Sequence, residues 1–527
     1  MLSAIILIPI LAAVGVSLLS KQAQGQHFKA IALGAIALTL GLSSLLALQF
    51  DIGNPALQFE EFLPWLDDLG LTYRLGVDGL SLPLVCINGL LSLVALYSSR
   101  AEIRRPRLYF SLVLLINAAV SGAFLAQNLL LFFIFYELEL IPLYLLIAIW
   151  GGVRRGYAAT KFLIYTAFSG VLILGAFLGL TWLSHASSFD YQPGLAQGLS
   201  LVQQTVLLIA LLIGFGIKVP LFPLHTWLPD AHVEASTPVS ILLAGVLLKL
   251  GTYGLVRFCL GLFPETWALL APWLAIWAVI SVLYGSLAAI AQTDMKKMVA
   301  YSSIGHMGYI LLACAAATPL SVLGAIFQML SHGLISALLF LLVGLVYEKT
   351  GTRDLQVLRG LLNPERGLPL VGSLMILGVM ASAGIPGMVG FISEFLVFRG
   401  SFSSFSIQTL LCMVGSGLTA VYFLLLVNRA FFGRLSTASP SFVPEPDRWL
   451  PAVSWGDRAT AIALSGLIAV LGLSPSWVIR WSESTSYSLS QPILSVTGNG
   501  TTQTALLAAP YLATPNLRSA PLSPPES

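Results

Sequence analysis

Residues 239–260 read VSILLAGVLLKLGTYGLVRFCL, an apolar run of membrane-spanning length with Lys249 near its middle. A transmembrane helix needs about 20 mostly apolar residues, and much of the 527-residue chain has the same character. Hydrophobic residues make up 57% of it and charged residues 9%, whereas a soluble domain carries about 25% charged residues. Because so few charges could not cover a water-facing surface, the sequence predicts an all-α integral membrane protein.

Fourteen segments are long and apolar enough to be predicted as transmembrane helices. They are 2–20, 30–50, 80–97, 108–126, 129–150, 162–183, 202–219, 239–260, 267–291, 299–317, 322–347, 370–395, 407–431 and 459–479. We expect the first to be a retained helix and not a signal peptide, because its positive charges follow the apolar run. We also expect a polar loop at 440–457 and, after about residue 487, a tail rich in Ser, Thr and Pro that is disordered or lies along a neighbour.

The basic residues orient these helices. With residue 1 outside, nineteen of the 26 Lys and Arg residues fall on inside loops and five on outside positions, Arg257 among the five. This bias agrees with the positive-inside rule, and the outer loop between the second and third spans is acidic. The two basic residues that remain, Lys218 and Lys249, lie in predicted spans.

Ionisable residues inside the predicted spans are the candidate functional residues. A charge at the bilayer centre costs about 2.5–3.5 kcal/mol on insertion scales, so such residues usually mark a proton or ion pathway. The spans contain Glu137, Glu139, Lys218, Lys249, His306, His332 and Glu394. Because Glu137 and Glu139 are about 200° apart around a helix, both cannot face one partner. We interpret Glu137 as functional, whereas an interfacial residue near a helix end fits Glu139 about as well as any other role does.

Two predicted spans are interrupted by Gly and Pro next to one ionisable group. Lys218 lies in GFGIKVPLFP (214–223) and Glu394 in GIPGMVGFISEF (384–395). For Lys218 the alternative is a helix-end lysine that reaches the headgroups. The breaks are five spans apart, however, and paired breaks in inverted repeats mark ion pathways in transporters.

This spacing predicts five regions. They are N-terminal helices in 1–107, a first five-helix unit in 108–262, an inverted second unit in 263–435, a loop and last helix in 436–485, and the tail in 486–527.

The two intramembrane histidines have polar neighbours at helical spacing. His332 continues a stripe with Gln328 and Ser336, and His306 is flanked by Ser302 and Tyr309. A lone intramembrane histidine is often only a packing residue. Two on adjacent spans favour a hydrated relay.

Other residues weigh against bound metals and redox groups. His225, Asp230, His232 and Glu234 are of types that bind zinc, but their spacing fits no standard ligand pattern. We expect them to form a polar connection at the inside mouth of a channel. The four cysteines are scattered singly and the net charge is only +3, so we expect no cofactor in this chain and no nucleic-acid partner.

Four motifs resemble subunit 4 of respiratory complex I, an antiporter-like subunit related to subunits 2 and 5 and to multisubunit sodium/proton antiporters. They are FYELELIP (135–142), PLHTWLPDAH (223–232), LAGVLLKLGTYG (243–254) and YSSIGHMG (301–308). The resemblance covers roughly residues 70–435. It implies fourteen helices, two inverted five-helix units at spans 4–8 and 9–13, and broken helices 7 and 12.

The resemblance also assigns roles. It implies that Glu137 is the channel glutamate, Lys218 the broken-helix lysine and Lys249 the central lysine. His306 and His332 would be the relay histidines and Glu394 the exit glutamate, where related subunits usually carry lysine.

WGGVRRGYAATKF (150–162) is similar to the photosynthetic version of the complex in cyanobacteria and chloroplasts, and HVEASTP (232–238) favours its CO2-uptake variant. This implies a thylakoid membrane with the N-terminus on the lumenal side. NAD(P)H or ferredoxin, FMN, iron–sulfur clusters and plastoquinone would act in other subunits. Subunit 5-like and subunit 2-like proteins, lipid and a CO2-hydration protein would be the partners.

The predicted mechanism begins with Glu137 paired to Lys218. Two charges about 4 Å apart interact by about 4 kcal/mol at an effective dielectric of about 20. Moving Glu137 away would lower the proton affinity of Lys218 and push a proton to Lys249, then through His306 and His332 to Glu394 and the outside. A stand-alone or Mrp-type sodium/proton antiporter subunit is the alternative. A structural spacer is disfavoured because it would not need buried lysines.

Overall fold

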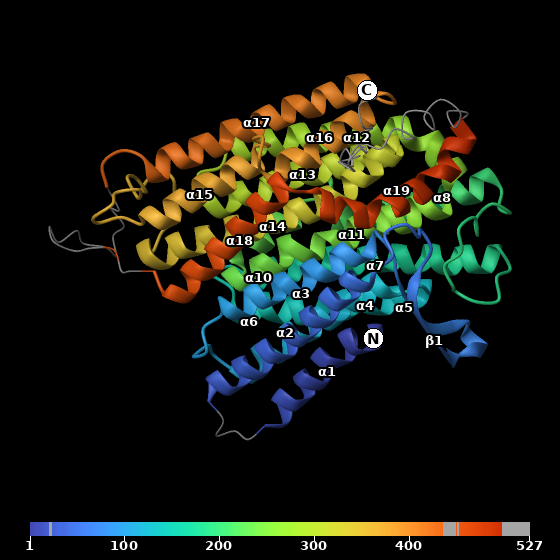
Figure 1. Ribbon diagram of the computed structural model, residues 1–527, viewed down its shortest axis with the longest axis horizontal. Helices are drawn as coiled ribbons and strands as arrows, with labels where there is room; N and C mark the ends of the chain where they lie inside the picture. Colours follow the sequence, from blue (N-terminus) through green and yellow to red (C-terminus); the bar gives the residue numbers. More distant parts are fainter. Residues whose placement is uncertain (20–23, 436–449, 451–452, 498–527) are drawn as a thin grey trace, which may run out of the picture.

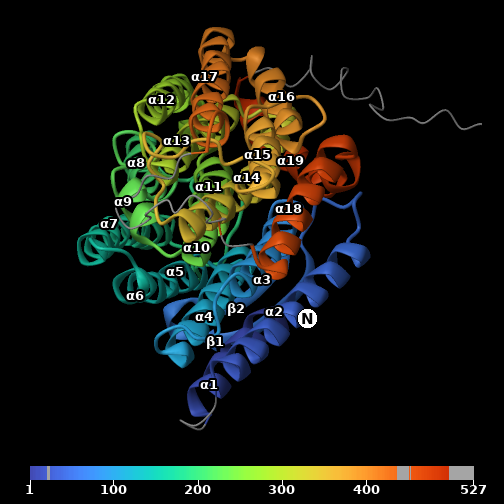
Figure 2. The same ribbon diagram turned by 90° about the vertical axis from the view of Figure 1, so that its left-hand side faces the viewer.

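The computed structural model describes residues 1–19, 24–435, 450 and 453–497. It is a bundle of long helices that mostly run alongside one another, with the N-terminal helices at one edge and α12 and α17 at the other (Figures 1 and 2). The elements before the first break are α1 (Leu2–Leu18), α2 (Gly25–Gln49), β1 (Gln58–Leu66), η1 (Asp67–Leu69), β2 (Leu71–Val77), α3 (Ser81–Tyr97), α4 (Pro106–Leu125), α5 (Leu129–Leu138), α6 (Leu140–Trp150), α7 (Arg155–Leu183) and α8 (Leu201–Lys218). After it come α9 (Trp227–Glu234), α10 (Thr237–Leu242), η2 (Leu243–Leu247), α11 (Leu248–Gly254), η3 (Leu255–Leu260), α12 (Pro264–Ile290), α13 (Met295–Ala316), α14 (Pro319–Thr350), α15 (Pro369–Ser382), α16 (Val389–Phe402), α17 (Ser406–Phe431), α18 (Trp455–Leu473) and α19 (Ser476–Thr497).

The helical membrane class predicted from the sequence is confirmed. In the described part of the chain, eleven helical segments are long and apolar enough to cross a membrane. Three shorter apolar helices, α1, α3 and α15, coincide with further predicted spans. The count of fourteen spans, the two inverted units and the five-region division stay predictions.

The central span lies between the two halves of the bundle. Its helical segments α10, η2, α11 and η3 run continuously from Thr237 to Leu260, and residues 239–260 of this apolar stretch are all buried. η2 and η3 are π-helical turns, a form that is rare and often found at functional sites. α11, which carries Lys249, lies between them.

Both predicted helix breaks are present. α8 ends at Lys218, and Trp227 Nε1 closes the break by donating to the carbonyl of Ile217 at 2.8 Å. α15 ends at Ser382, and α16 begins at Val389. Gly384 and Gly387 turn the chain between them with φ of +68° and +90°, angles that an L side chain rarely adopts.

The acidic segment between α2 and α3 contains an antiparallel hairpin that the all-α prediction missed. β1 pairs with β2, and the register has irregularities between Gln58 and Glu61 and between Pro64 and Leu66. Strand residues alternate only weakly there, because most of β1 is exposed.

The predicted loop and tail boundaries also need correction. α18 already begins at Trp455, inside the predicted loop, and α19 continues to Thr497 through the start of the predicted tail. Two hydrogen bonds fix α19 against the chain just before α3. Ser482 Oγ donates to the Gly79 carbonyl at 2.6 Å, and Thr485 Oγ1 accepts from the Gly79 N–H at 2.9 Å. Positions 440–449, 451–452 and 498–527 of the predicted loop and tail lie outside the described residues.

Candidate functional site

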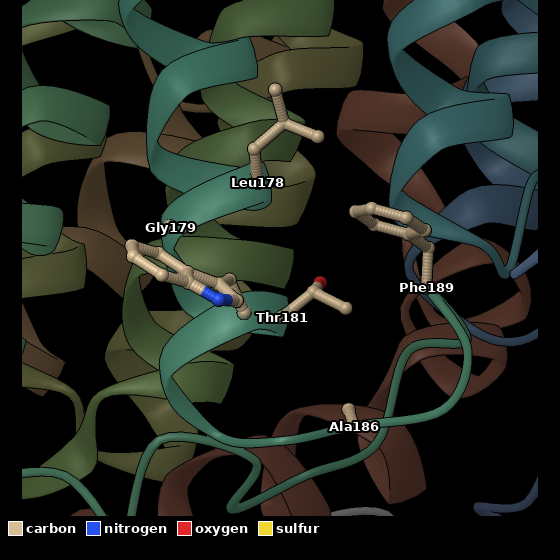
Figure 3. A pocket seen from close by; sticks show the side chains of 6 residues that line it. Leu178, Gly179, Thr181, Ala186 and Phe189 are labelled. Atoms are coloured by element: carbon tan, nitrogen blue, oxygen red, sulfur yellow. The ribbon is translucent and has the colours of Figure 1, made fainter. Parts of the chain in front are cut away.

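The ionisable residues predicted from the sequence lie inside the bundle and not in a surface pocket. Lys218, Lys249, His306, His332 and Glu394 are each 5% exposed or less. Glu137 is half-buried. A shallow hollow lies near the C-terminal end of α7, and none of the candidate functional residues lines it. Its lining residues are Leu178, Gly179, Thr181, Trp182, Ala186 and Phe189 (Figure 3).

Lys218 forms an ion pair with Glu139. Its ammonium donates to Glu139 Oε1 and lies 4.4 Å from the centre of the Tyr136 ring. The Lys218 side chain is 1% exposed and that of Glu139 is 0% exposed. The predicted pairing of Lys218 with Glu137 is therefore wrong, and of the roles left open for Glu139 the interfacial one does not fit its burial.

The junction of α5 and α6 explains this arrangement. α5 ends at Leu138 and α6 begins at Leu140, so Glu139 lies at the junction. Pro142 has no N–H with which to bond the Leu138 carbonyl. The two glutamates still point to different sides of the span, as their 200° spacing predicts. It is Glu139, however, whose side chain faces the interior of the bundle.

Glu137 faces α7 at the edge of the bundle. A Cβ built on Gly170 of α7 would lie 2.3 Å from Glu137 Oε1, so the carboxylate lies directly against the Gly170 backbone. In the described part of the chain this carboxylate has no hydrogen-bond or ion-pair partner. Its neighbours along the helix, Ile134, Leu138 and Ile141, are 38%, 40% and 55% exposed.

Lys249 is bonded to His332. Its ammonium lies 2.8 Å from His332 Nδ1 and donates to the Ala244 carbonyl of η2 at 2.5 Å. Glycines make this contact possible, since a Cβ on Gly333 would lie 2.9 Å from the Gly245 carbonyl. As predicted, Lys249 lies deep in its span, far from any helix end.

His332, His306 and Glu394 continue the row. The two imidazole rings lie 5.5 Å apart between centres, and His306 Nδ1 is 3.8 Å from Glu394 Oε1. The predicted order is reversed: His332 contacts Lys249, and His306 contacts Glu394.

Polar side chains bond to His306 and Glu394, the two residues of the row farthest from Lys249. His306 Nε2 lies 3.1 Å from Ser382 Oγ, and Ser416 Oγ donates to Glu394 Oε2 at 2.7 Å. Gln328, predicted beside His332, instead has its Nε2 3.4 Å from His306 Nδ1.

Gly251 of α11 packs against the end of α8. A Cβ there would lie 2.7 Å from Val219 Cγ2 and 3.1 Å from Lys218 Cβ, so no larger residue fits without movement. No side-chain hydrogen bond joins Lys218 to Lys249 within the described ranges. The structure thus brings the candidates together in two groups, Lys218 with Glu139 and Lys249 with His332, His306 and Glu394.

The four residues of the His225 cluster have separate partners. Lys161 donates to Asp230 at 2.8 Å, the Arg154 N–H donates to Glu234 at 2.9 Å, and His225 Nε2 lies 3.2 Å from Tyr284 Oη. His232 is 0% exposed and stacks on Phe340 with ring centres 4.5 Å apart. Among the described residues neither ring nitrogen of His232 has a hydrogen-bond partner, which is unusual for a buried polar group.

A second buried ion pair was missed from the sequence. Arg257, counted there as an outside residue, is 4% exposed in η3 and donates to Asp78 Oδ2 at 2.5 Å. Its Nε also donates to Tyr253 Oη at 3.2 Å. Asp78 in turn accepts from the N–H groups of Leu80 and Ser81 at the start of α3. No sequence signal links Asp78 to Arg257, because they are 179 residues apart.

Comparison with known proteins gives consistent matches. The family described as "NADH:quinone oxidoreductase/Mrp antiporter, TM" matches residues 126–419. The NAD(P)H-quinone oxidoreductase chain 4 1 of Synechococcus sp. (strain JA-3-3Ab) is 42% identical over 90% of this chain and 89% of its own. Chain 4 2 of Microcystis aeruginosa is 44% identical over 82% of this chain and 79% of its own.

Solved structures agree on the fold. A chain of respiratory complex I from Thermus thermophilus superposes with a TM-score of 0.83 at 26% identity, over 94% of this chain and all of that one. A chain of the Mrp complex from Dietzia sp. has a TM-score of 0.81 at 21% identity, over 94% of this chain and 98% of that one.

The chain is therefore an antiporter-like membrane subunit: its fold is a helical bundle with two broken spans, and a row of lysine, histidine and glutamate lies buried inside. The chain belongs to the NAD(P)H-quinone oxidoreductase chain 4 family, whose members matched here come from cyanobacteria.

Proposed function

We propose that this chain translocates protons across a membrane as a subunit of an NAD(P)H-quinone oxidoreductase complex. The observation that carries the proposal is the contact of Lys249 Nζ with His332 Nδ1 at 2.8 Å, in a completely buried span. An ammonium and an imidazole ring nitrogen at this distance can exchange a proton directly. Charged groups are costly in a membrane interior and usually mark a pathway of this kind.

The proton moves along the buried row in four steps. Lys218 keeps its proton while paired with a carboxylate and releases it toward Lys249 when that attraction weakens. Lys249 passes the proton to His332, which lies beside His306. His306 delivers it to Glu394, 3.8 Å away, from which it leaves on the outer side. The gap between the two lysines and the spacing of the two rings require intervening water, which commonly bridges buried polar groups.

The redox chemistry belongs to other subunits. Four single cysteines, all free within the described chain, give this chain no set of iron–sulfur ligands. NAD(P)H or ferredoxin, FMN, iron–sulfur clusters and plastoquinone act elsewhere in the complex, and electron transfer there changes the position or charge of groups near Lys218.

The proposed membrane and partners rest on the cyanobacterial relatives together with features of the sequence. Cyanobacterial homologues support a thylakoid membrane, with the N-terminus in the lumen as the distribution of basic residues indicates. Subunit 5-like and subunit 2-like membrane proteins are the proposed neighbours, and the motif 232–238 favours a form that works with a CO2-hydration protein.

Isolation of the native complex followed by proton-uptake measurements tests this function. Co-isolation with iron–sulfur subunits, and proton uptake that stops in Glu394→Gln but not in the control Glu365→Gln, are expected. Glu365 is a suitable control because it is an exposed glutamate in a loop. A chain that is isolated without redox subunits and exchanges sodium for protons would instead be an antiporter.

A further inference from the structure

We propose that a hollow at the end of α17 binds the phosphate headgroup of an anionic phospholipid. This hollow has a volume of about 500 Å³ and lies between the segment that follows α14 and the last residues of α17. Gln356, Arg359, Asn428 and Arg429 form its polar lining, and Phe432 is part of its apolar wall. None of the residues of the buried proton row lines it, so the site is separate from the proposed proton route.

Two arginines give the hollow a positive charge. Arg359 and Arg429 are both exposed, and in the described part of the chain neither guanidinium has a hydrogen-bond or ion-pair partner. A guanidinium presents a planar fork of N–H donors that matches two phosphate oxygens. Asn428 and Gln356 add amide donors next to this fork. Since no carboxylate lines the hollow among the described residues, its walls favour an anion.

The end of α17 does not repel an anion there, because its carbonyls are already bonded. The last carbonyls of a helix are usually unsatisfied and carry a partial negative charge. Here the N–H groups of residues 360–362 donate to the carbonyls of residues 430–432 at distances of 3.0–3.1 Å. Gly360 allows this close approach with φ of +69°, and a Cβ there would lie 2.4 Å from the Leu435 nitrogen. The same bonds hold the two arginine-bearing segments side by side.

An exposed apolar stripe leads along α17 to the hollow. Val414, Val421 and Leu424 are 56%, 44% and 63% exposed. They share one face of α17 with Asn428, because spacings of three, four and seven residues return to the same side of a helix. α17 lies at the edge of the bundle (Figures 1 and 2), and Phe432 continues the apolar surface beside the hollow. A ligand with an anionic head and a hydrocarbon tail can use both surfaces, whereas free phosphate can use only the hollow.

The position and size of the hollow agree with a lipid headgroup. α17 is long and apolar enough to cross a membrane, and the hollow lies at its last residues, where a span meets the headgroup layer. Basic pockets at this level between transmembrane helices bind anionic headgroups. A volume of about 500 Å³ is within the range of about 300–1,000 Å³ that small-ligand sites have. It is large enough for a phosphate and its glycerol.

The test uses the intact complex, stripped of lipid in detergent, and a photoactivatable phosphatidylglycerol whose crosslinks to this chain are mapped by mass spectrometry. We expect crosslinks near the end of α17, with competition by unlabelled phosphatidylglycerol and none by zwitterionic phosphatidylcholine. Arg359→Gln and Arg429→Gln should each raise the apparent Kd about fivefold, and the double variant about thirtyfold, the change expected for one and for two basic residues at an anionic membrane surface. The control Arg155→Gln, an exposed arginine at the start of α7, should leave the Kd unchanged.

Inorganic phosphate and Leu424→Ser distinguish a lipid headgroup from free phosphate. For a lipid, inorganic phosphate competes far more weakly than phosphatidylglycerol, and Leu424→Ser raises the Kd. Equal competition by inorganic phosphate, with no effect of Leu424→Ser, would indicate a free-phosphate site and overturn the lipid assignment. An unchanged Kd in the double arginine variant, or an equal rise in Arg155→Gln, also overturns the proposal. If the double variant does not assemble, the two single variants decide by the same criterion.

Discussion

The break after α8 and the break between α15 and α16 carry ionisable groups of opposite sign and hold them differently. At the first, Lys218 is in direct contact with a carboxylate, Glu139. At the second, Glu394 accepts a hydrogen bond from Ser416 and lies 3.8 Å from a neutralisable partner, His306. A proton can therefore arrive at or leave Glu394 without breaking an ion pair, whereas movement at Lys218 requires one to be broken. In the proposed proton route, the first break is therefore the controlled step and the second break the release step.

Breaking the pair at the first break should have the largest effect. Lys218→Met leaves Glu139 buried without a counter-charge, which costs about 3–5 kcal/mol. We expect a lower yield of assembled complex and no proton uptake in what assembles, measured by purification yield and vesicle acidification. Lys218→Met with native yield and native pumping would show that the pair neither stabilises the bundle nor lies on the route.

The buried pair outside the two breaks gives a contrast between stability and transport. Asp78→Asn removes the charged partner of Arg257, while the amide oxygen can still accept from the N–H groups at the start of α3. We expect a loss of thermal stability of about 3 kcal/mol, at the lower end for a broken buried pair because the amide can still accept a bond. The protons pumped per electron in the assembled complex should not change. A changed ratio would place Asp78 and Arg257 on the route.

Substitution of Gly384, in the turn between α15 and α16, should affect both stability and proton release. Gly384 has φ of +68°, and a Cβ there would lie 2.8 Å from Glu394 Oε2. Gly384→Ala is expected to cost about 1–2 kcal/mol of stability and to slow proton release by displacing Glu394. Gly466→Ala, where a Cβ meets nothing within 4 Å, is the matched control. Equal behaviour of the two variants would show that Glu394 does not need this position.

Gly170 of α7, which lies against Glu137, should tolerate substitution better than Gly384 does. In Gly170→Ala the new methyl group meets the end of the flexible Glu137 side chain, which can move away. We expect thermal stability to change by less than about 0.5 kcal/mol, with a measurable drop in pumping rate only. A large loss of stability would mean that the Glu137 carboxylate is as firmly held as that of Glu139.

The smallest expected effect is on the pH dependence of stability, through His225 in the segment after α8. Burial, and next the charge of Lys161, lowers the pKa of His225 from its usual 6.5 to about 4. A group whose pKa is lower in the folded state stabilises the fold less as pH falls, so stability at this site should decrease between about pH 6.5 and pH 4. His225→Gln should flatten the thermal-melting profile in this range. An identical slope in both proteins would mean that His225 takes up its proton equally well when folded.

The sequence was sufficient for the positions of the breaks but not for the choice between two glutamates. Gly and Pro next to Lys218 and Glu394 interrupt helices by local chemistry, which can be read without a structure. The angle between Glu137 and Glu139 is also local. Which of them faces the interior depends on how α5 and α6 pack, and the apolar residues on all sides of that span give no amphipathic signal.

Long-range packing accounts for the other missed features. The order of His332 and His306 depends on contacts between segments far apart in the sequence, which place His332 against Lys249 and His306 against Glu394. Arg257 near the end of an apolar run is indistinguishable from a headgroup-facing residue until Asp78 is seen beside it. The hairpin β1–β2 was missed because its exposed first strand has little alternation of polar and apolar side chains.

The proton-to-electron ratio of an assembled complex carrying Lys249→Met tests the central claim most directly, with Leu248→Met as the control on the same turn. Lys249 has no carboxylate partner to leave unpaired in the described chain, so assembly should be preserved. The buried row predicts a clearly lower ratio in Lys249→Met and a native ratio in Leu248→Met. A native ratio in Lys249→Met would show that protons do not cross the membrane through this row.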